Sequence, residues 1–120
     1  MEKAKKFQDL VVWQKSHQLV LQVYRLTQRF PEAERFGLIS QMRRASVSIP
    51  ANIAEGFTKM GKKDKAHYYN IAQGSLEELK YYFILSEDIG YCESNKELRD
   101  LADEIGKMLN GLINSVRSVP

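Results

Sequence analysis

Apolar residues recur along most of the chain at intervals of three and four positions, which is the spacing of amphipathic helices. This pattern predicts helices over about residues 9–29, 37–57 and 64–89, and a fourth that begins at a capping box of Ser94 and Glu97. No stretch alternates between apolar and polar residues for long enough to predict a sheet. Four helices of about 20–25 residues with short connections predict an all-α fold, an antiparallel up-and-down four-helix bundle, as a single domain of residues 1–120.

Two of the predicted helices carry more apolar surface than one bundle covers. The first helix has one seam through Val12, Leu19 and Leu26, and a second seam that begins at Trp13. The third helix also has two seams, of which the second comprises Tyr68, Ile71, Tyr82, Leu85 and Ile89. A lone bundle buries about one seam per helix, and monomers rarely expose a large apolar patch. The residues alone therefore predict a homo-oligomer of at least two chains.

The boundary and the core face of the later helices are also predicted. Gly90 follows the third helix and is the residue type that most often ends a helix. In the fourth helix a spacing of about seven residues predicts a core face made of Leu98, Leu101, Ile105, Met108 and Leu112.

Residues 43–56, RRASVSIPANIAEG, interrupt the pattern with a proline and many small side chains. Placed on a helix, one face of this region stays apolar, a register that a loop has no reason to keep: Leu38, Met42, Ala45, Ile49, Ile53 and Gly56. We therefore predict a helix that continues through Pro50 and is kinked there, because proline removes an amide and deprives the Ser46 carbonyl of its donor. The small residues up to Gly56 predict close contact with a large aromatic side chain, either Trp13 or a tyrosine of the third helix. Asn52 is predicted to lie on the core side of this structural motif.

Three groups of residues carry a likeness to a known family: Leu10-x-Val12-Trp13-Gln14-Lys15, Phe30-Pro31-x-x-Glu34-x-Phe36-Gly37-Leu38 and Gln41-x-Arg43-Arg44-Ala45-x-Val47-Ser48-Ile49-Pro50-Ala51-Asn52-Ile53-Ala54-Glu55-Gly56. With them the chain resembles the bacterial 23S rRNA-intervening-sequence protein family, whose members are often called four-helix-bundle proteins. The resemblance implies an up-and-down bundle that assembles as a homopentamer, and it implies no established biochemical activity. In architecture the chain is also similar to the accessory protein of diversity-generating retroelements, a basic pentamer that works with a reverse transcriptase and nucleic acid.

The formal charge of +3 is unevenly distributed along the sequence. Residues 1–65 contain 13 lysines and arginines against 6 acidic residues, which gives +7. Residues 66–120 contain 5 against 9, which gives −4. Such asymmetry favours either attraction between subunits or one basic face for a polyanion.

The basic residues are the best candidates for a binding site. Four lysines surround the predicted turn between the second and third helices: Lys59, Lys62, Lys63 and Lys65. Arg43 and Arg44 precede them, and Tyr68 and Tyr69 follow directly. Lysines neutralise phosphates and tyrosines stack on bases, so this region is predicted to bind RNA or DNA without sequence preference. The alternative is a solubilising loop with no such role.

Patterns typical of catalysis and metal binding are missing from the sequence. Di-iron bundles use two Glu-x-x-His pairs, but the residue three before His17 is Gln14, and Asp64, three residues before His67, is interpreted as a helix cap. The single Cys92 is interpreted as a small apolar side chain. No glycine-rich phosphate loop occurs, and the longest run without a charged residue, Ala66 to Leu76 with 11 residues, is too short to span a bilayer. We therefore expect no enzyme activity, cofactor, metal or membrane contact.

The sequence thus predicts a non-enzymatic, oligomeric scaffold or accessory protein that binds RNA or DNA through a repeated basic surface. The alternative is a structural or protein–protein interaction module with no nucleic-acid role. A cytoplasmic location is expected, because the lysines at the N-terminus precede no apolar signal segment and one cysteine fits a reducing compartment. Residues 1–8 are predicted to be a flexible basic segment.

Overall fold

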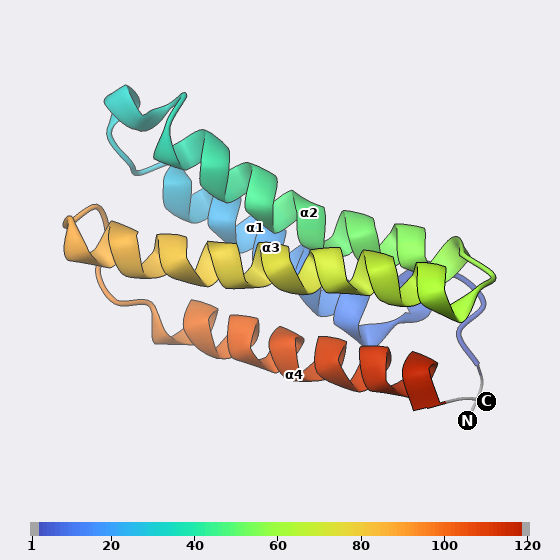
Figure 1. The fold of residues 1–120 in the computed structure, drawn as a ribbon. Coiled ribbons are helices and arrows are strands. Elements are labelled where there is room, and N and C mark those ends of the chain that lie inside the picture. The colour runs from blue at the N-terminus through green and yellow to red at the C-terminus, as the bar shows by residue number, and fades with distance from the viewer. Residues whose placement is uncertain (1–2, 119–120) are drawn as a thin grey trace.

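The computed structural model describes residues 3–118 and is all-helical over that range. Its long helices are α1 (Val11–Thr27), α2 (Leu38–Thr58), α3 (Lys62–Asp88) and α4 (Lys96–Ser118), with two short 3₁₀ helices, η1 (Phe7–Asp9) and η2 (Glu32–Glu34). Successive long helices run in opposite directions and pack in chain order, and α4 returns to α1 (Figure 1). The predicted all-α up-and-down four-helix bundle is therefore confirmed.

The core is a continuous apolar column between the four helices. Each helix contributes side chains that are almost wholly buried: Leu19 and Val23 from α1, Met42, Ile49 and Ile53 from α2, Leu76 and Leu79 from α3, and Ile105 and Leu109 from α4. Across residues 3–118, none of the helices is both long enough and apolar enough to cross a membrane.

Helix α2 continues through Pro50, as predicted. Ala45, Ile49, Ile53 and Gly56 are buried on one face, so the apolar register indeed passes through the proline. The kink at Pro50 stays a prediction. One turn before Pro50, the Ser46 hydroxyl donates to the Arg43 carbonyl oxygen at 2.9 Å.

Asn52 lies at the edge of the core, where it is only half-buried. Its side-chain amide donates to the Ser48 carbonyl oxygen at 2.8 Å and to the Ser48 hydroxyl at 2.9 Å. The Ser75 hydroxyl of α3 also donates to the Ser48 hydroxyl, at 2.8 Å. The prediction that Asn52 lies on the core side is thus met only in part, since Asn52 lies at the rim of the core. The Ser75–Ser48 hydrogen bond beside it joins α2 to α3.

The close approach predicted from the small residues occurs at Gly56. A Cβ atom added there would lie 2.6 Å from Tyr69 Cε1 and 2.9 Å from Tyr69 Cδ1. The Tyr69 side chain is itself buried, with 2% of its surface exposed. At Gly56, the predicted aromatic neighbour is therefore a tyrosine of the third helix, Tyr69.

The start of α4 differs from the prediction by one residue. The Asn95 side-chain oxygen, and not Ser94, accepts the Leu98 amide at 3.0 Å, and the Asn95 carbonyl accepts the Arg99 amide at 3.1 Å. Asparagine and serine cap helices about equally well, so the sequence did not discriminate between neighbours. Before this helix, Gly90 has a φ of 82°, and α3 ends beside it as predicted.

The core face of α4 is also rotated from the predicted one. The buried residues are Leu98, Ala102, Ile105, Leu109 and Ile113, whereas Leu101, Met108 and Leu112 are only partly buried at the flank. The prediction followed a seven-residue spacing, whereas the buried residues follow the period of a straight helix, about 3.6 residues. Ala102 occupies a central position because a small side chain allows the neighbouring helices to approach.

Residues 1–8, predicted to be flexible, lie partly outside the described residues. Within the described part, the Phe7 ring lies edge-on to the Trp13 ring at 5.1 Å between centroids. The Asp9 carboxylate accepts the backbone amides of Lys5 and Lys6 at 3.0 and 3.3 Å. The Phe7–Trp13 contact packs η1 against the start of α1, and the Asp9 hydrogen bonds order the backbone before η1.

Candidate nucleic-acid interface

The antiparallel topology collects positive charge at one end of the bundle. The α2–α3 turn, the N-terminal segment and the last turns of α4 all lie at this end (Figure 1). We call residues 3–19, 48–75 and 107–117 the basic end. They contain ten lysines and arginines against three acidic residues, which gives +7. Residues 20–47 and 76–106, at the opposite end, contain eight against eleven, which gives −3.

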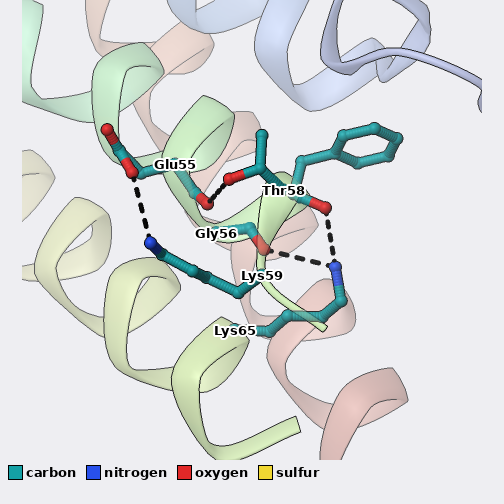
Figure 2. Close-up of polar contacts among 6 residues, drawn as sticks. Glu55, Gly56, Thr58, Lys59 and Lys65 are labelled. Carbon is teal, nitrogen blue, oxygen red and sulfur yellow. Dashed lines mark hydrogen bonds and ion pairs between the residues drawn. The ribbon is translucent and has the colours of Figure 1, made fainter. Parts of the chain in front are cut away.

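Lys65 is the candidate lysine that the fold uses structurally. Its ammonium donates to the carbonyl oxygens of Gly56 at 3.2 Å and Phe57 at 2.8 Å, at the C-terminus of α2 (Figure 2). Partial burial lowers the pKa of Lys65. A positive charge at this position satisfies the last carbonyls of α2 and opposes the negative end of its dipole.

Lys59 extends along the outside of the same turn. Its ammonium lies 3.8 Å from the Glu55 carboxylate, one helical turn earlier, and 5.1 Å from the centroid of the Tyr68 ring. Figure 2 shows Glu55 and Thr58 on the same turn, where the Thr58 hydroxyl donates to the Glu55 carbonyl oxygen at 2.8 Å. Lys59 therefore remains available to an anion, although Glu55 offsets part of its charge.

Lys62 and Lys63 are exposed and border a pocket of about 440 Å³ between the start of α3 and the end of α4. Among the described residues, His67, Asn70 and Arg117 also line this pocket. Arg117 was not among the residues singled out from the sequence, and His67 was considered only as a metal ligand. The up-and-down topology was the available signal, because it places the end of the fourth helix beside the turn between the second and third.

Arg43 and Arg44 lie away from the loop lysines. Arg43 precedes Lys59 by sixteen residues, which corresponds to about 24 Å along a helix. Its guanidinium carbon lies 4.5 Å from the centroid of the Tyr24 ring, and its Nε donates to the Thr27 hydroxyl at 3.0 Å. The predicted candidate residues therefore belong to two separate surfaces, and Arg43 joins α2 to α1.

Arg44 borders a shallow groove on the outer face of α2. The groove has a volume of about 690 Å³, and its lining mixes cations with apolar side chains: Tyr24, Arg35, Phe36, Ile39, Arg43, Arg44, Val47 and Ala51. Phe36 is 89% exposed, and the Arg35 guanidinium carbon lies 5.4 Å from the centroid of its ring. The sequence prediction missed Arg35 and Phe36 as surface residues.

The two tyrosines after the loop have different environments. Burial against Gly56 leaves Tyr69 with no surface on which a base could stack, and burial raises its pKa. Tyr68 is half-buried, with Lys59 over its ring. Of the two tyrosines, only Tyr68 has ring surface exposed at this turn.

Positive charge is the chemical feature that these surfaces share. Among the described residues, no three histidine, cysteine, aspartate or glutamate side chains lie together as metal ligands would. Burial, and secondarily the charge of Glu87, raises the pKa of the Cys92 thiol, which disfavours the nucleophilic thiolate. The lysines and arginines instead offer hydrogen-bond donors and charge to phosphate groups.

Fold and surface together define a small four-helix bundle whose positive charge is concentrated at one end. The chain belongs to the 23S rRNA-intervening sequence protein family, whose model matches residues 8–111. It is similar to a crystal structure from Bacteroides thetaiotaomicron, described as a protein with unknown function from the S23 ribosomal protein family. The two are 26% identical with a TM-score of 0.74, over 86% of this chain and 98% of the other. No curated protein matches the sequence.

Proposed function

We propose that this protein is a non-enzymatic, oligomeric scaffold or accessory protein that binds RNA or DNA without sequence preference through its basic end. The separation of charge between +7 at this end and −3 at the other is the observation that carries the proposal. A field of this kind attracts polyanions and orients them before contact. In this proposal the protein acts in the cytoplasm, where nucleic acid is accessible.

Assembly is part of the proposal because apolar side chains remain on the surface of one chain. Among the described residues, those at least 39% exposed include Val11, Leu21, Tyr24, Val47, Ile71, Tyr81, Ile84 and Ile89. A homopentamer is the assembly that the family resemblance implies. If subunits pack side by side, their basic ends form one rim, and repeated weak sites then bind a long strand with high avidity.

The names of the related proteins indicate which nucleic acid to test first. The family's name refers to a sequence within 23S rRNA, and the similar structure is assigned to a ribosomal protein family. Transcribed 23S rRNA fragments are therefore the first probe, with single-stranded and duplex DNA as comparisons.

The test is fluorescence anisotropy at low salt with these probes. Wild type should bind all of them, with an affinity that falls steeply as salt rises, because the contacts are to phosphates. A variant with Lys62, Lys63 and Arg117 all changed to glutamate should bind at least about tenfold more weakly, with a shallower salt dependence. Lys65 is left unchanged because it caps α2.

Two controls show whether weaker binding by the triple variant results from lost positive charge or from unfolding. Arg25→Glu reverses an exposed charge on α1, away from the basic end, and should bind nearly as wild type does. Circular dichroism should show that the triple variant melts as a folded helical protein. No affinity of wild type for RNA or DNA at low salt would overturn the proposal.

The second candidate is a protein–protein interaction module with no nucleic-acid role. The groove on α2 favours it, since the 89% exposed ring of Phe36 beside Val47 and Ala51 is apolar surface of the kind that interfaces cover. Phe36→Asp together with Val47→Asp should abolish capture of a protein partner from a nuclease-treated lysate if this candidate is correct.

A further inference from the structure

The groove on the outer face of α2 (the α2 groove) combines positive charge with exposed apolar side chains. Residues 35–52 supply all of its lining except Tyr24, and they contain three arginines and no acidic residue, a charge of +3. Glu32, just before this segment, lies 3.7 Å from Arg35 and offsets part of that charge. Phe36 is almost wholly exposed in the groove. Because protein interfaces favour arginine and aromatic residues, this surface suits an apolar partner with negative charge.

The outward side of α3 has the opposite charge and apolar surface of its own. Residues 77–88 contain four acidic residues against one lysine, a charge of −3. Four residues of this segment are exposed and share one side of the helix, because they follow each other at intervals of four, three and four positions: Glu77, Tyr81, Ile84 and Asp88. We call these four residues the α3 stripe. Tyr81 is 56% and Ile84 50% exposed, so the stripe has apolar surface to bury against a partner.

The α2 groove and the α3 stripe lie at the same height along the bundle. The Ser86 hydroxyl of α3 donates to the Met42 sulfur of α2 at 3.5 Å, and the Ser75 hydroxyl donates to the Ser48 hydroxyl at 2.8 Å. These contacts set the stripe level with the part of α2 between Met42 and Ser48, which borders the middle of the groove. A second copy that stands beside the first with its helices parallel therefore brings its stripe to the groove without sliding along the bundle.

The difference between the two surfaces determines how copies of the chain can join. Two grooves or two stripes would bring charges of like sign together, whereas a groove and a stripe join +3 to −3. A contact between two different surfaces leaves a free groove at one end of the assembly and a free stripe at the other, so chains add until a ring closes. Since neighbouring copies are parallel, such a ring gathers the basic ends on one side.

We propose that the α2 groove of one chain binds the α3 stripe of a second copy, an inference that rests on the assembly in the proposed function and names its contact surfaces. Tyr81 and Ile84 of the stripe pack against Val47 in the groove. The carboxylates of the stripe pair with the exposed guanidinium groups of Arg35 and Arg44. Repetition of this one contact builds the ring.

The test uses two variants that each lose one surface. Val47→Asp places a charge in the groove and keeps the stripe, whereas Ile84→Asp places a charge in the stripe and keeps the groove. In sedimentation each variant alone should be a single chain. Mixed in equal amounts, they should form a complex of one copy of each and no larger particle, because only one intact groove and one intact stripe remain to meet.

Amide NMR spectra locate the contact even where the complex is weak. Labelled Val47→Asp protein should show shifts in residues 77–88 when unlabelled Ile84→Asp protein is added. With the labels exchanged, the shifts should fall in residues 35–52. Shifts confined to other segments would contradict the assigned surfaces.

Further changes within this pair of variants assign the side chains. Ile71→Asp, the matched change on another side of α3, should leave the binding of Val47→Asp protein to Ile84→Asp protein intact. Arg44→Glu, added to the Ile84→Asp protein, should weaken binding at least about tenfold, and so should Asp88→Lys added to the Val47→Asp protein. Combining both reversals should restore part of the lost affinity, since the charges are complementary again. Circular dichroism checks that each variant is folded.

The outcomes for this contact and for the proposed function are distinguishable. If wild type assembles and binds 23S rRNA fragments but the two variants do not bind each other, the contact is wrong and the proposed function stands. If the variants form the one-to-one complex but wild type binds neither RNA nor DNA, the proposed function is wrong and the contact stands. Ile84→Asp protein that assembles by itself as wild type does would show that the groove binds another surface or another protein, and would overturn the inference.

Discussion

Gly56 occupies a place in α2 that a side chain would have to share with Tyr69. Alanine is ordinarily favoured over glycine inside a helix by about 0.5–1 kcal/mol. Here the new Cβ atom would lie 2.6 Å from a ring atom of Tyr69, whose side chain is buried. Overpacking of this kind costs about 1–3 kcal/mol, so steric conflict outweighs helix propensity.

Gly56→Ala should therefore lower the free energy of unfolding by about 1–2 kcal/mol. Gly74→Ala is the matched control, because Gly74 lies inside α3, is exposed and has no atom within 4 Å of an added Cβ. That change should raise stability by about 0.5–1 kcal/mol. Urea denaturation of both variants measures the difference. If both variants change the free energy of unfolding by the same amount, the Tyr69 ring moves aside and its packing against Gly56 is not close.

The Glu34 carboxylate joins the start of α2 to the α3–α4 connection. It accepts the Tyr91 hydroxyl at 2.6 Å and the Leu38 amide at 3.2 Å. These hydrogen bonds, chiefly the one from Tyr91, lower the pKa of Glu34 below its ordinary value of 4.5. Because the folded-state pKa is the lower one, this contribution to stability is present above pH 4.5 and is lost as the pH falls through the folded value.

Tyr91→Phe removes that hydroxyl and should lower the melting temperature at pH 7. It should also flatten the fall in stability on acidification below about pH 5, since Glu34 then gains less from ionisation. Tyr81→Phe is the control, because Tyr81 is 56% exposed and the same hydroxyl is removed from the surface. Thermal melts at several pH values provide the measurement. Parallel pH profiles for wild type and Tyr91→Phe would refute the role of this bond.

At the scale of the elements, the joint between α2 and α3 depends on Lys65. Its ammonium meets two carbonyl oxygens at the end of α2, so one side chain of α3 closes the preceding helix. Lys65→Ala leaves these carbonyls to water and should lower the free energy of unfolding by about 0.5–1.5 kcal/mol. Lys63→Ala, an exposed change two residues earlier, should stay within about 0.5 kcal/mol of wild type. Equal changes in the free energy of unfolding for both variants, measured by chemical denaturation, would contradict a stabilising role of Lys65 at the end of α2.

At the scale of the whole molecule, the exposed apolar residues predict assembly. Sedimentation at micromolar concentration should give a particle several times heavier than the 13.9 kDa chain. Val47 is 41% exposed on α2, and a buried charge is strongly unfavourable at an interface, so Val47→Asp should shift the distribution towards the single chain. Ser94→Asp, an exposed change in the α3–α4 connection, should not. A wild-type particle of 13.9 kDa, the mass of one chain, would contradict the prediction of assembly.

The sequence alone determined the four helices, the continuation of α2 through Pro50 and the likeness to the family. These features are local, since helical periodicity and motif spacing are properties of consecutive residues. It also located the loop lysines and the small-residue face that receives Tyr69. It did not determine the first residue of α4, because neighbouring residues were equally good caps. It also did not determine the exact core face of α4, because two adjacent apolar stripes share Leu98 and Ile105.

The tertiary structure alone decided what each candidate side chain does. Arg43 and Lys65 look like free cations in the sequence, yet one stacks on Tyr24 of α1 and the other caps α2. Arg117 is 54 residues from Lys63, and only the return of α4 to the basic end places both beside one pocket. Contacts between helices depend on which faces meet and at what height along the bundle, and no single helix contains that information.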